Sequence, residues 1–377
     1  MKNSPLIAVV LLAAVLLSVL KSKAQTGSLN LLIGTYTNGG KSEGIYTYTF
    51  DAASADFKLK SVAKGVENPS YLTLGENNKF VYSVNESGNK STVSAFSFDG
   101  AKGELKFLNK ELTQGADPCY IIADGKNVIS ANYSGGSASV FGIQKDGSLG
   151  ALKQLVQHKG SSANKGRQEA SHVHMVAFSP DRKYVLINDL GTDKVYLYQY
   201  NPDSEKNVLV AKDSVAIDAG AGPRHLTFSK DGKYVYLLRE LDGGVTAFSY
   251  SKGTLKNIQE VKITAEGFTG ENGAADIHLS PDGKFLYASN RGSENKITIF
   301  AVEKGGILNK SGQVSTGGKG PRNFVIDPSG KFLLVANQGS NQVVIFERDL
   351  GTGALKDTGK RIEIGSPVCL VFAPVKG

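Results

Sequence analysis

One pattern of apolar and polar positions recurs along most of the chain. Each copy has a short apolar segment, a tight Asp-Gly-Lys type of turn, and a second apolar segment that ends in Asn or a charged residue. Apolar runs of about four to eight residues bounded by turn signals are typical of strands. Each copy therefore predicts a pair of strands joined by a hairpin. The copies lie at residues 68–86, 117–133, 172–189, 222–240, 275–291 and 320–338, with a truncated copy at 366–369.

The turns between the paired strands are nearly identical, as in Ser280–Lys284 and Asp327–Lys331. Proline presets φ for a turn, and glycine supplies the positive φ that a tight hairpin needs. A third strand follows each pair, as at residues 194–198, and a weaker fourth strand follows that, as at residues 255–263. Four strands in roughly 45 to 55 residues are the size of one β-propeller blade.

Six full copies and one truncated copy predict seven blades. Residues 30–36 and 44–50 repeat the second-strand and third-strand pattern, so they can supply the outer strands that the last copy lacks. We expect them to pair with a C-terminal strand at residues 368–372, because this closure removes a free sheet edge. The sequence thus predicts an all-β fold at residues 26–377. It is a seven-bladed β-propeller of four-stranded antiparallel blades, with the ring closed by N- and C-terminal strands in one blade.

The first 25 residues have the pattern of an export signal. Lys2 precedes an apolar run from Leu6 to Leu20, which has the length of a signal-peptide core and is short for a membrane span. Ser22-Lys23-Ala24 places small residues where a signal peptidase cuts. We expect a signal peptide at residues 1–25, a periplasmic or secreted protein, and no stable membrane insertion after cleavage. An uncleaved anchor is the alternative.

Composition and charge narrow the possible partners. The chain has 44 glycines, 17 phenylalanines and 15 tyrosines, which suits short strands joined by tight turns. The net charge is +8, but the basic residues are scattered and form no arginine-rich run, so we expect no nucleic-acid partner. Cys119 and Cys369 fall on the inner strands of non-adjacent blades. Two buried free thiols are expected, with a disulfide as the alternative.

Two positions of the repeat indicate where a site would form, because the first strand of each blade lines the channel and strand ends shape its mouth. The residues near the start of the first strand, here called the channel positions, are Ser70, Cys119, His174, Arg224, Ala275, Arg322 and Val368. The residues that end the second strand, here called the strand-end positions, are Glu86, Tyr133, Leu190, Glu240, Arg291 and Gln338. A structural repeat does not require a histidine, a glutamate and three arginines there. We expect these five in one pocket, with a salt-bridged plug of the channel as the alternative.

Neighbouring residues extend the candidate set. His172 lies two residues before His174 and, by strand alternation, on the same face, so the sequence leaves open which imidazole acts. His158 is expected to be solvated in a loop. The further candidates for substrate binding are Arg322, His172, Arg239, Asn290, Asn337 and Glu86; the two asparagines have the alternative role of bonding turn backbone. No metal-ligand spacing, phosphate loop or nucleophile elbow occurs in the sequence, so we expect no metal and no other cofactor.

Several segments in the same order resemble the lactonase, seven-bladed β-propeller family, whose members include bacterial 6-phosphogluconolactonase and fungal carboxy-cis,cis-muconate cyclase. They lie at residues 33–37, 171–174, 189–194, 220–225, 274–278 and 289–291. In the muconate-cyclase branch, a histidine, two arginines and a glutamate around the channel are proposed to act. The resemblance carries these roles to His174, Arg224, Arg291 and Glu240, and it implies no metal.

The leading hypothesis is therefore a lactonase that hydrolyses a sugar-type lactone to its hydroxy acid, similar to 6-phosphogluconolactonase. Arg224 and Arg291 would stabilise the oxyanion and hold an acidic substituent. Glu240 or His174 would activate the water as general base. The expected partner is a small-molecule lactone or acidic sugar. The alternatives are a muconate-type cycloisomerase and a non-catalytic propeller that binds a ligand or a protein.

Overall fold

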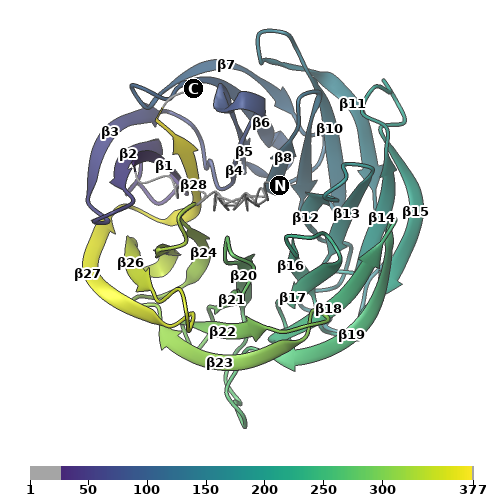
Figure 1. The fold of residues 1–377 in the computed structure, drawn as a ribbon. Coiled ribbons are helices and arrows are strands. Elements are labelled where there is room, and N and C mark those ends of the chain that lie inside the picture. The colour runs from purple at the N-terminus through teal and green to yellow at the C-terminus, as the bar shows by residue number, and fades with distance from the viewer. Residues whose placement is uncertain (1–26, 376–377) are drawn as a thin grey trace, which may run out of the picture.

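The computed structural model describes residues 27–375 and confirms the seven-bladed ring (Figure 1). Seven four-stranded antiparallel sheets surround a central channel, and successive blades follow the chain around the ring. The signal peptide predicted for residues 1–25 lies outside the described residues. Between residues 27 and 375, none of the helical segments has the length and apolar character needed to cross a bilayer.

Each sheet runs from an inner strand at the channel to an outer strand at the rim. The blade that joins the chain ends consists of β28 (Pro367–Pro374), β1 (Ser28–Thr35), β2 (Gly44–Asp51) and β3 (Phe57–Lys64). Each of the other six blades is built from four consecutive strands. The first three of them are β4 (Leu72–Leu74), β5 (Phe80–Asn85), β6 (Thr92–Asp99) and β7 (Glu104–Leu112); β8 (Pro118–Ala123), β9 (Asn127–Asn132), β10 (Ser137–Ile143) and β11 (Leu149–Gln157); and β12 (Val173–Phe178), β13 (Tyr184–Asp189), β14 (Lys194–Tyr200) and β15 (Leu209–Ala216). The last three are β16 (Pro223–Phe228), β17 (Tyr234–Arg239), β18 (Gly244–Ser251) and β19 (Thr254–Lys262); β20 (Ala274–Leu279), β21 (Phe285–Asn290), β22 (Lys296–Val302) and β23 (Leu308–Ser315); and β24 (Pro321–Ile326), β25 (Phe332–Asn337), β26 (Gln342–Arg348) and β27 (Leu355–Glu363). Short 3₁₀ turns are η1 (Glu76–Asn78), η2 (Gly88–Lys90) and η3 (Gln338–Ser340).

The two ends of the chain close the ring as predicted. β1 pairs antiparallel with β28, with Leu31 opposite Phe372 and Gly34 opposite Cys369. β28 also contacts the neighbouring inner strands β24 and β4, so the inner ring of strands is continuous. Cys119 and Cys369 are both buried and free, which confirms the prediction of two buried thiols.

Apolar packing between neighbouring blades holds the ring together. Seven hydrophobic clusters occur among the described residues, and each is built mainly from two adjacent blades. The cluster between the closing blade and its neighbour includes Phe50 and Phe332, whose rings meet edge to face at 5.9 Å. Because the middle strands are covered on both faces, β25 is buried along its whole length. This explains why the second strands read as continuous apolar runs.

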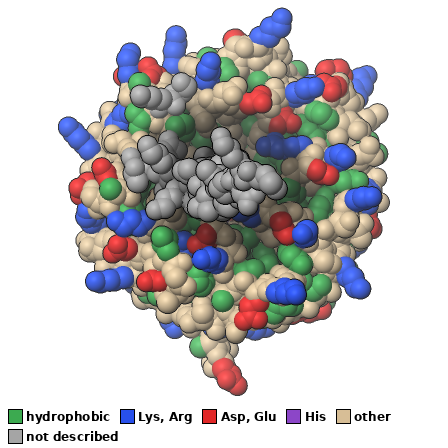
Figure 2. Space-filling view, in the orientation of Figure 1, with side chains coloured by type: hydrophobic (Ala, Val, Ile, Leu, Met, Phe, Trp, Pro, Cys, Tyr) green, Lys and Arg blue, Asp and Glu red, His purple; other side chains and the backbone are tan. Residues whose placement is uncertain are grey.

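Charged side chains are distributed over the surface of the ring. On the face shown in Figure 2, Lys and Arg side chains are interspersed with Asp and Glu side chains around the rim, and they do not gather in one stripe. This mixture is typical of a solvated protein surface.

Candidate active site

The channel positions coincide with β-bulges in the inner strands. The register between β12 and β13 skips His174, and the register between β16 and β17 skips Arg224. Arg322 in β24 and Cys119 in β8 are skipped in the same way. A bulge bends the strand and re-aims the side chain of the extra residue. The repeat thus carries, in blade after blade, a local irregularity beside the channel.

The strand-end positions reach the same mouth through a repeated backbone hydrogen bond. The N–H of Glu240 donates to the carbonyl of Gly222, two residues before Arg224, at 2.7 Å. This bond places each strand-end residue beside the channel position of its own blade. The equivalent bonds run from Arg291 to Gly273 at 3.1 Å, from Tyr133 to Asp117 at 2.9 Å and from Glu86 to Asn68 at 3.4 Å.

Residues of both kinds line one cavity of about 370 Å³. It contains the predicted residues His174, Glu240, Arg291, Arg322 and Glu86, which come from five different blades. The remaining lining residues are Asp117, Cys119, Tyr133, Ser134 and Arg167. The volume lies in the range of small-molecule sites, at about 300–1,000 Å³.

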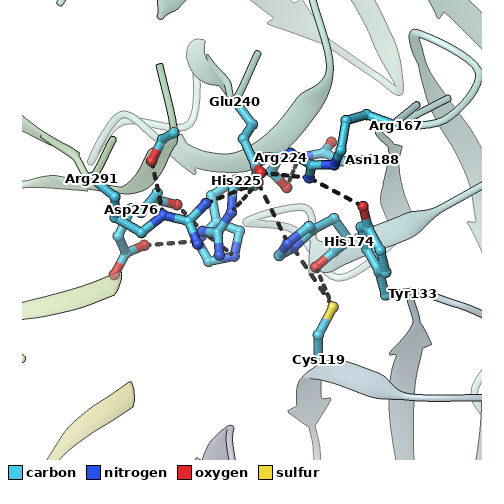
Figure 3. Close-up of polar contacts among 12 residues, drawn as sticks. Cys119, Tyr133, Arg167, His174, Asn188, Arg224, His225, Glu240, Asp276 and Arg291 are labelled. Carbon is cyan, nitrogen blue, oxygen red and sulfur yellow. Dashed lines mark hydrogen bonds and ion pairs between the residues drawn. The ribbon is translucent and has the colours of Figure 1, made fainter. Parts of the chain in front are cut away.

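Glu240 is the centre of a charged cluster (Figure 3). Its Oε1 accepts a hydrogen bond from Arg167 at 2.7 Å, and its Oε2 accepts one from Nε of Arg224 at 2.8 Å. Nη2 of Arg291 lies 3.2 Å from the same Oε2. Burial alone would raise the pKa of Glu240, but the charges of Arg291, Arg224 and Arg167 outweigh it and lower the pKa to about 2. Glu240 therefore stays ionised at neutral pH and pairs with three guanidinium groups.

Arg224 does not lie on the cavity wall, in contrast to the predicted contact with substrate. Its side chain is 1% exposed, and its Nη1 donates to the carbonyl of Ala275 and lies 3.3 Å from Nε2 of His225. The guanidinium is held by these buried partners and by Glu240. Arg224 is therefore part of the support behind the cavity.

The buried carboxylate of Asp276 orients His225, which in turn contacts Arg224. Nδ1 of His225 lies 2.8 Å from Oδ1 of Asp276, and Oδ2 of Asp276 lies 3.0 Å from Nε2 of His278. A proton on Nδ1 of His225 is placed to bond the carboxylate, which leaves Nε2 free to accept from Arg224. Burial and the charge of Arg224 lower the pKa of His225 to about 4, so the ring is neutral at neutral pH.

His174 lies between Cys119 and Glu240. Its Nδ1 is 3.6 Å from Sγ of Cys119, and its Nε2 is 3.9 Å from Oε2 of Glu240. Burial, followed by the charge of Arg224, lowers the pKa of His174 well below its usual value. Burial raises the pKa of the Cys119 thiol to about 12, so this thiol is not an activated nucleophile.

Of the two histidines between which the sequence left the choice open, His174 lines the cavity and His172 does not. The His172 ring stacks on Tyr133 at 4.5 Å, and its Nε2 lies 3.1 Å from Oε1 of Glu169. The alternation that placed both histidines on one face fails because the bulge falls at His174.

Three further candidate residues point away from the cavity, and their side chains contact other residues of the blades instead. They are the last residues of their second strands, so by alternation they face opposite to the strand-end positions. Nη1 of Arg239 donates to Glu260 at 2.7 Å, and Nδ2 of Asn337 donates to the carbonyl of Thr316 at 2.9 Å. The carbonyl oxygen of the Asn290 side chain accepts from the N–H of Gly273 at 3.0 Å. The prediction that these residues bind substrate has no support in this geometry.

Sequence reasoning missed Arg167, which enters the cavity from the loop between β11 and β12. Besides its bond to Glu240, Nη2 of Arg167 donates to the hydroxyl of Tyr133 at 3.2 Å. His158 at the start of this loop is buried and lies 3.1 Å from Asp189, so the prediction that it is solvated was wrong. The one signal for Arg167 was its place in the segment between β11 and β12, which is longer than the segment that joins any other two blades.

A second polar group surrounds Glu86. Its Oε1 accepts hydrogen bonds from the Tyr36 hydroxyl at 2.8 Å and from Ser70. The guanidinium of Arg322 lies 5.5 Å from the centre of the Tyr36 ring. Over the described range 27–375, this guanidinium has no hydrogen bond or ion pair with protein. Arg322 is therefore available to an anionic ligand.

The buried histidines predict an acid-sensitive fold. His225 and His174 have lower pKa values in the folded chain than their usual value near 6.5, so the unfolded chain binds protons that the folded chain does not. We expect the free energy of unfolding to fall as the pH drops from about 6.5 toward about 4. Glu240 extends the loss from its usual pKa of 4.5 down to about 2. The raised pKa of His278 opposes part of the loss near neutral pH.

Urea unfolding between about pH 8 and pH 4 measures this dependence. A matched His225→Gln variant should show a flatter profile above about pH 4, because it removes one of the groups that titrates only in the unfolded chain. A wild-type stability that stays constant or rises on acidification would contradict the expectation.

Comparisons with known proteins place the chain among relatives of the same fold. A family model described as lactonase, 7-bladed beta-propeller matches residues 30–372. The 6-phosphogluconolactonase of Bacillus subtilis strain 168 is 37% identical over 345 residues, which cover 90% of this chain and 97% of that protein. The 6-phosphogluconolactonase of Formosa agariphila is 38% identical and covers 86% and 94%, respectively. The solved structure of the periplasmic gluconolactonase of Pseudomonas aeruginosa matches with a TM-score of 0.88 at 38% identity, over 93% of this chain and all of that one.

Proposed function

This chain belongs to the lactonase, seven-bladed β-propeller family, and we propose that it hydrolyses the ring ester of a sugar-type lactone to the open hydroxy acid. One observation carries the proposal. A buried anion, Glu240, holds three guanidinium groups, and those of Arg167 and Arg291 line a cavity of about 370 Å³. Such a site can stabilise negative charge that develops on a small ligand. The curated relatives named 6-phosphogluconolactonase, which align over nearly their whole length, support this reaction.

Arg291 is the arginine best placed to stabilise the oxyanion. Attack of water on the ring carbonyl places negative charge on the carbonyl oxygen, and a donor already held in position stabilises it most. Arg291 lines the cavity, and its Nε donates to the carbonyl of Gly273 at 2.8 Å while Nη2 faces Glu240. Burial lowers the pKa of Arg291 to about 10, so it stays cationic at neutral pH.

The other three predicted catalytic groups have supporting roles in this proposal. Glu240 is a weak base because its three guanidinium partners lower its pKa to about 2. His174 is also a weak base, because burial and Arg224 disfavour its protonated form. Glu240 and Arg224 are positioning residues for Arg291, and His174 forms a neutral part of the wall.

Arg322 would bind an acidic substituent of the substrate. Guanidinium groups pair with carboxylate or phosphate through two parallel hydrogen bonds. Arg322 lines the cavity, and among the residues that the structure describes its guanidinium has no hydrogen bond or ion pair. A phosphorylated lactone should therefore have a lower KM than its unphosphorylated counterpart, and the Arg322→Ala variant should lose this preference.

We also propose that the protein acts outside the cytoplasm. The export-signal pattern of residues 1–25 supports this location, and so does the similarity to a periplasmic gluconolactonase. Fractionation of cells that produce the full chain, with detection of the mature N-terminus, tests it. Retention of the uncut chain in the cytoplasm would overturn it.

The reaction is tested by following acid release from glucono-δ-lactone and 6-phosphoglucono-δ-lactone at constant pH, with spontaneous hydrolysis subtracted. We expect the purified protein to accelerate hydrolysis of at least one lactone. A cis,cis-muconate assay in parallel tests the cyclising alternative. If the folded protein accelerates no lactone hydrolysis, the proposal fails, and the muconate result decides between a cycloisomerase and a binding propeller.

A further inference from the structure

Glu240 is fully engaged, so the base that activates water must be sought elsewhere in the cavity. Three carboxylates line it: Glu86, Asp117 and Glu240. Both oxygens of Glu240 face guanidinium groups. Oδ1 of Asp117 accepts the backbone N–H of Gly88 at 2.8 Å, as part of the turn that leads into β8. Glu86 is held by two side-chain hydroxyls at one oxygen, and its other oxygen has no hydrogen-bond partner within residues 27–375. Oδ2 of Asp117 likewise has no partner there, but a single backbone N–H holds the Asp117 carboxylate, so Glu86 is the more firmly fixed of the two.

Two hydroxyl groups fix the Glu86 carboxylate in place. Oε1 accepts one hydrogen bond from Tyr36, which directly follows β1, and one from Ser70, the channel position of the same blade as Glu86. Oε2 has no hydrogen-bond partner within residues 27–375. A carboxylate anchored through one oxygen presents the other to a water molecule in a fixed direction. We propose that Glu86 is the general base that activates the hydrolytic water, an inference that rests on the proposed lactone hydrolysis.

The surroundings of Glu86 suit this role. The charged and titratable groups that face it are Tyr36, Arg322, Asp117 and Cys119. Burial raises the pKa of Glu86 although Arg322 opposes the rise. A carboxylate whose pKa is closer to the working pH is a stronger base while it remains ionised. Glu86 is thereby the opposite of Glu240, whose pKa falls.

The step balances without any further reactant. The water oxygen forms a bond to the ring carbonyl carbon, and one water proton passes to Oε2 of Glu86. The resulting oxyanion faces Arg291 until the bond between the carbonyl carbon and the ring oxygen breaks. The proton on Glu86 then passes to the departing ring oxygen. The product is the open hydroxy acid, and Glu86 returns to the carboxylate.

The Glu86→Gln variant is the direct test, because it keeps the shape and an oxygen acceptor while it removes the base. We expect kcat to fall by about 10²- to 10⁴-fold. KM should change by no more than about threefold, because the amide removes a transition-state interaction rather than substrate binding. The fall of kcat/KM at acid pH, here called the acid limb of the pH profile, should disappear. In a Glu86→Ala variant, added formate should restore part of the rate, which a merely structural glutamate would not allow.

Tyr36→Phe provides a second, independent readout. The Tyr36 hydroxyl bond stabilises the Glu86 carboxylate, so its removal raises the pKa of Glu86. The acid limb should therefore move to higher pH in Tyr36→Phe, while turnover at alkaline pH persists. An unmoved limb would count against Glu86 as the titrating group.

The outcomes separate the two proposals. If the wild-type protein hydrolyses a lactone while Glu86→Gln keeps its rate and acid limb, the base assignment is overturned and the lactonase function stands. Loss of rate in Asp117→Asn, with Glu86→Gln unaffected, would transfer the role to Asp117. If the wild-type protein accelerates no lactone hydrolysis, the proposed function is overturned, and the base assignment with it.

Discussion

Replacement of Arg291 by alanine is expected to lower kcat on a hydrolysed lactone by about 10²- to 10³-fold, the usual effect of removing one preorganised oxyanion donor. The Arg291 guanidinium is held by Gly273 and Glu240 before substrate arrives, so it stabilises charge without reorganisation. Its side chain is 21% exposed, and its loss leaves Glu240 paired with Arg224 and Arg167. The fold should therefore persist.

Steady-state kinetics on the lactone, with a thermal melt of each variant, measure this effect. Arg361→Ala is the matched control, because Arg361 lies on the outer strand β27 and pairs with Asp357 at the surface. That control should keep the wild-type rate. A wild-type kcat in folded Arg291→Ala would remove Arg291 from the mechanism, and a melted variant would show that its role is structural.

Replacement of Arg224 by alanine should cost about 3–5 kcal/mol of unfolding free energy, the range for breaking a buried ion pair on one side. The side chain is 1% exposed, and its loss leaves Glu240 with less compensation in a buried position. The carbonyl of Ala275 also loses its donor. Urea unfolding at neutral pH measures the change, with Arg361→Ala again as the control.

A double-mutant cycle with Glu240→Gln identifies the cause. Because an uncompensated carboxylate accounts for much of the damage, the double variant should lose less stability than the sum of the two single variants. Coupling of this kind is expected at direct contact, where Nε of Arg224 lies 2.8 Å from Oε2 of Glu240. Additive losses would contradict an ion-pair origin and point to lost packing alone.

The fold could be predicted because each blade repeats local signals. The hairpin turns and the apolar strands are short-range features, and their sevenfold repetition indicated a ring. Closure followed from the match between residues 30–36 and the second-strand pattern, and β1 pairs with β28 as that match required. A cleavage site in residues 1–25 remains a prediction outside the described residues.

The candidate site could be predicted only in part. Comparison of the repeat copies selected His174, Glu240, Arg291, Arg322 and Glu86, all of which line one cavity. The same comparison also selected Arg239, Asn290 and Asn337, which turn outward. Arg167 was not selected because it lies in a loop outside the repeated strands, where the copies of the repeat cannot be aligned with one another.

The amino-acid sequence by itself determined the ring and the positions at which each blade meets the channel, because strands, turns and their repetition depend on residues close together in the chain. Only the tertiary structure decided which charges meet. Glu240 binds arginines from its own blade, from the next blade and from a distant loop. Glu86 has hydroxyl partners at one oxygen and, within residues 27–375, no hydrogen-bond partner at the other. Charge pairing and burial set the pKa of each carboxylate, and both depend on neighbours that only the closed ring brings together.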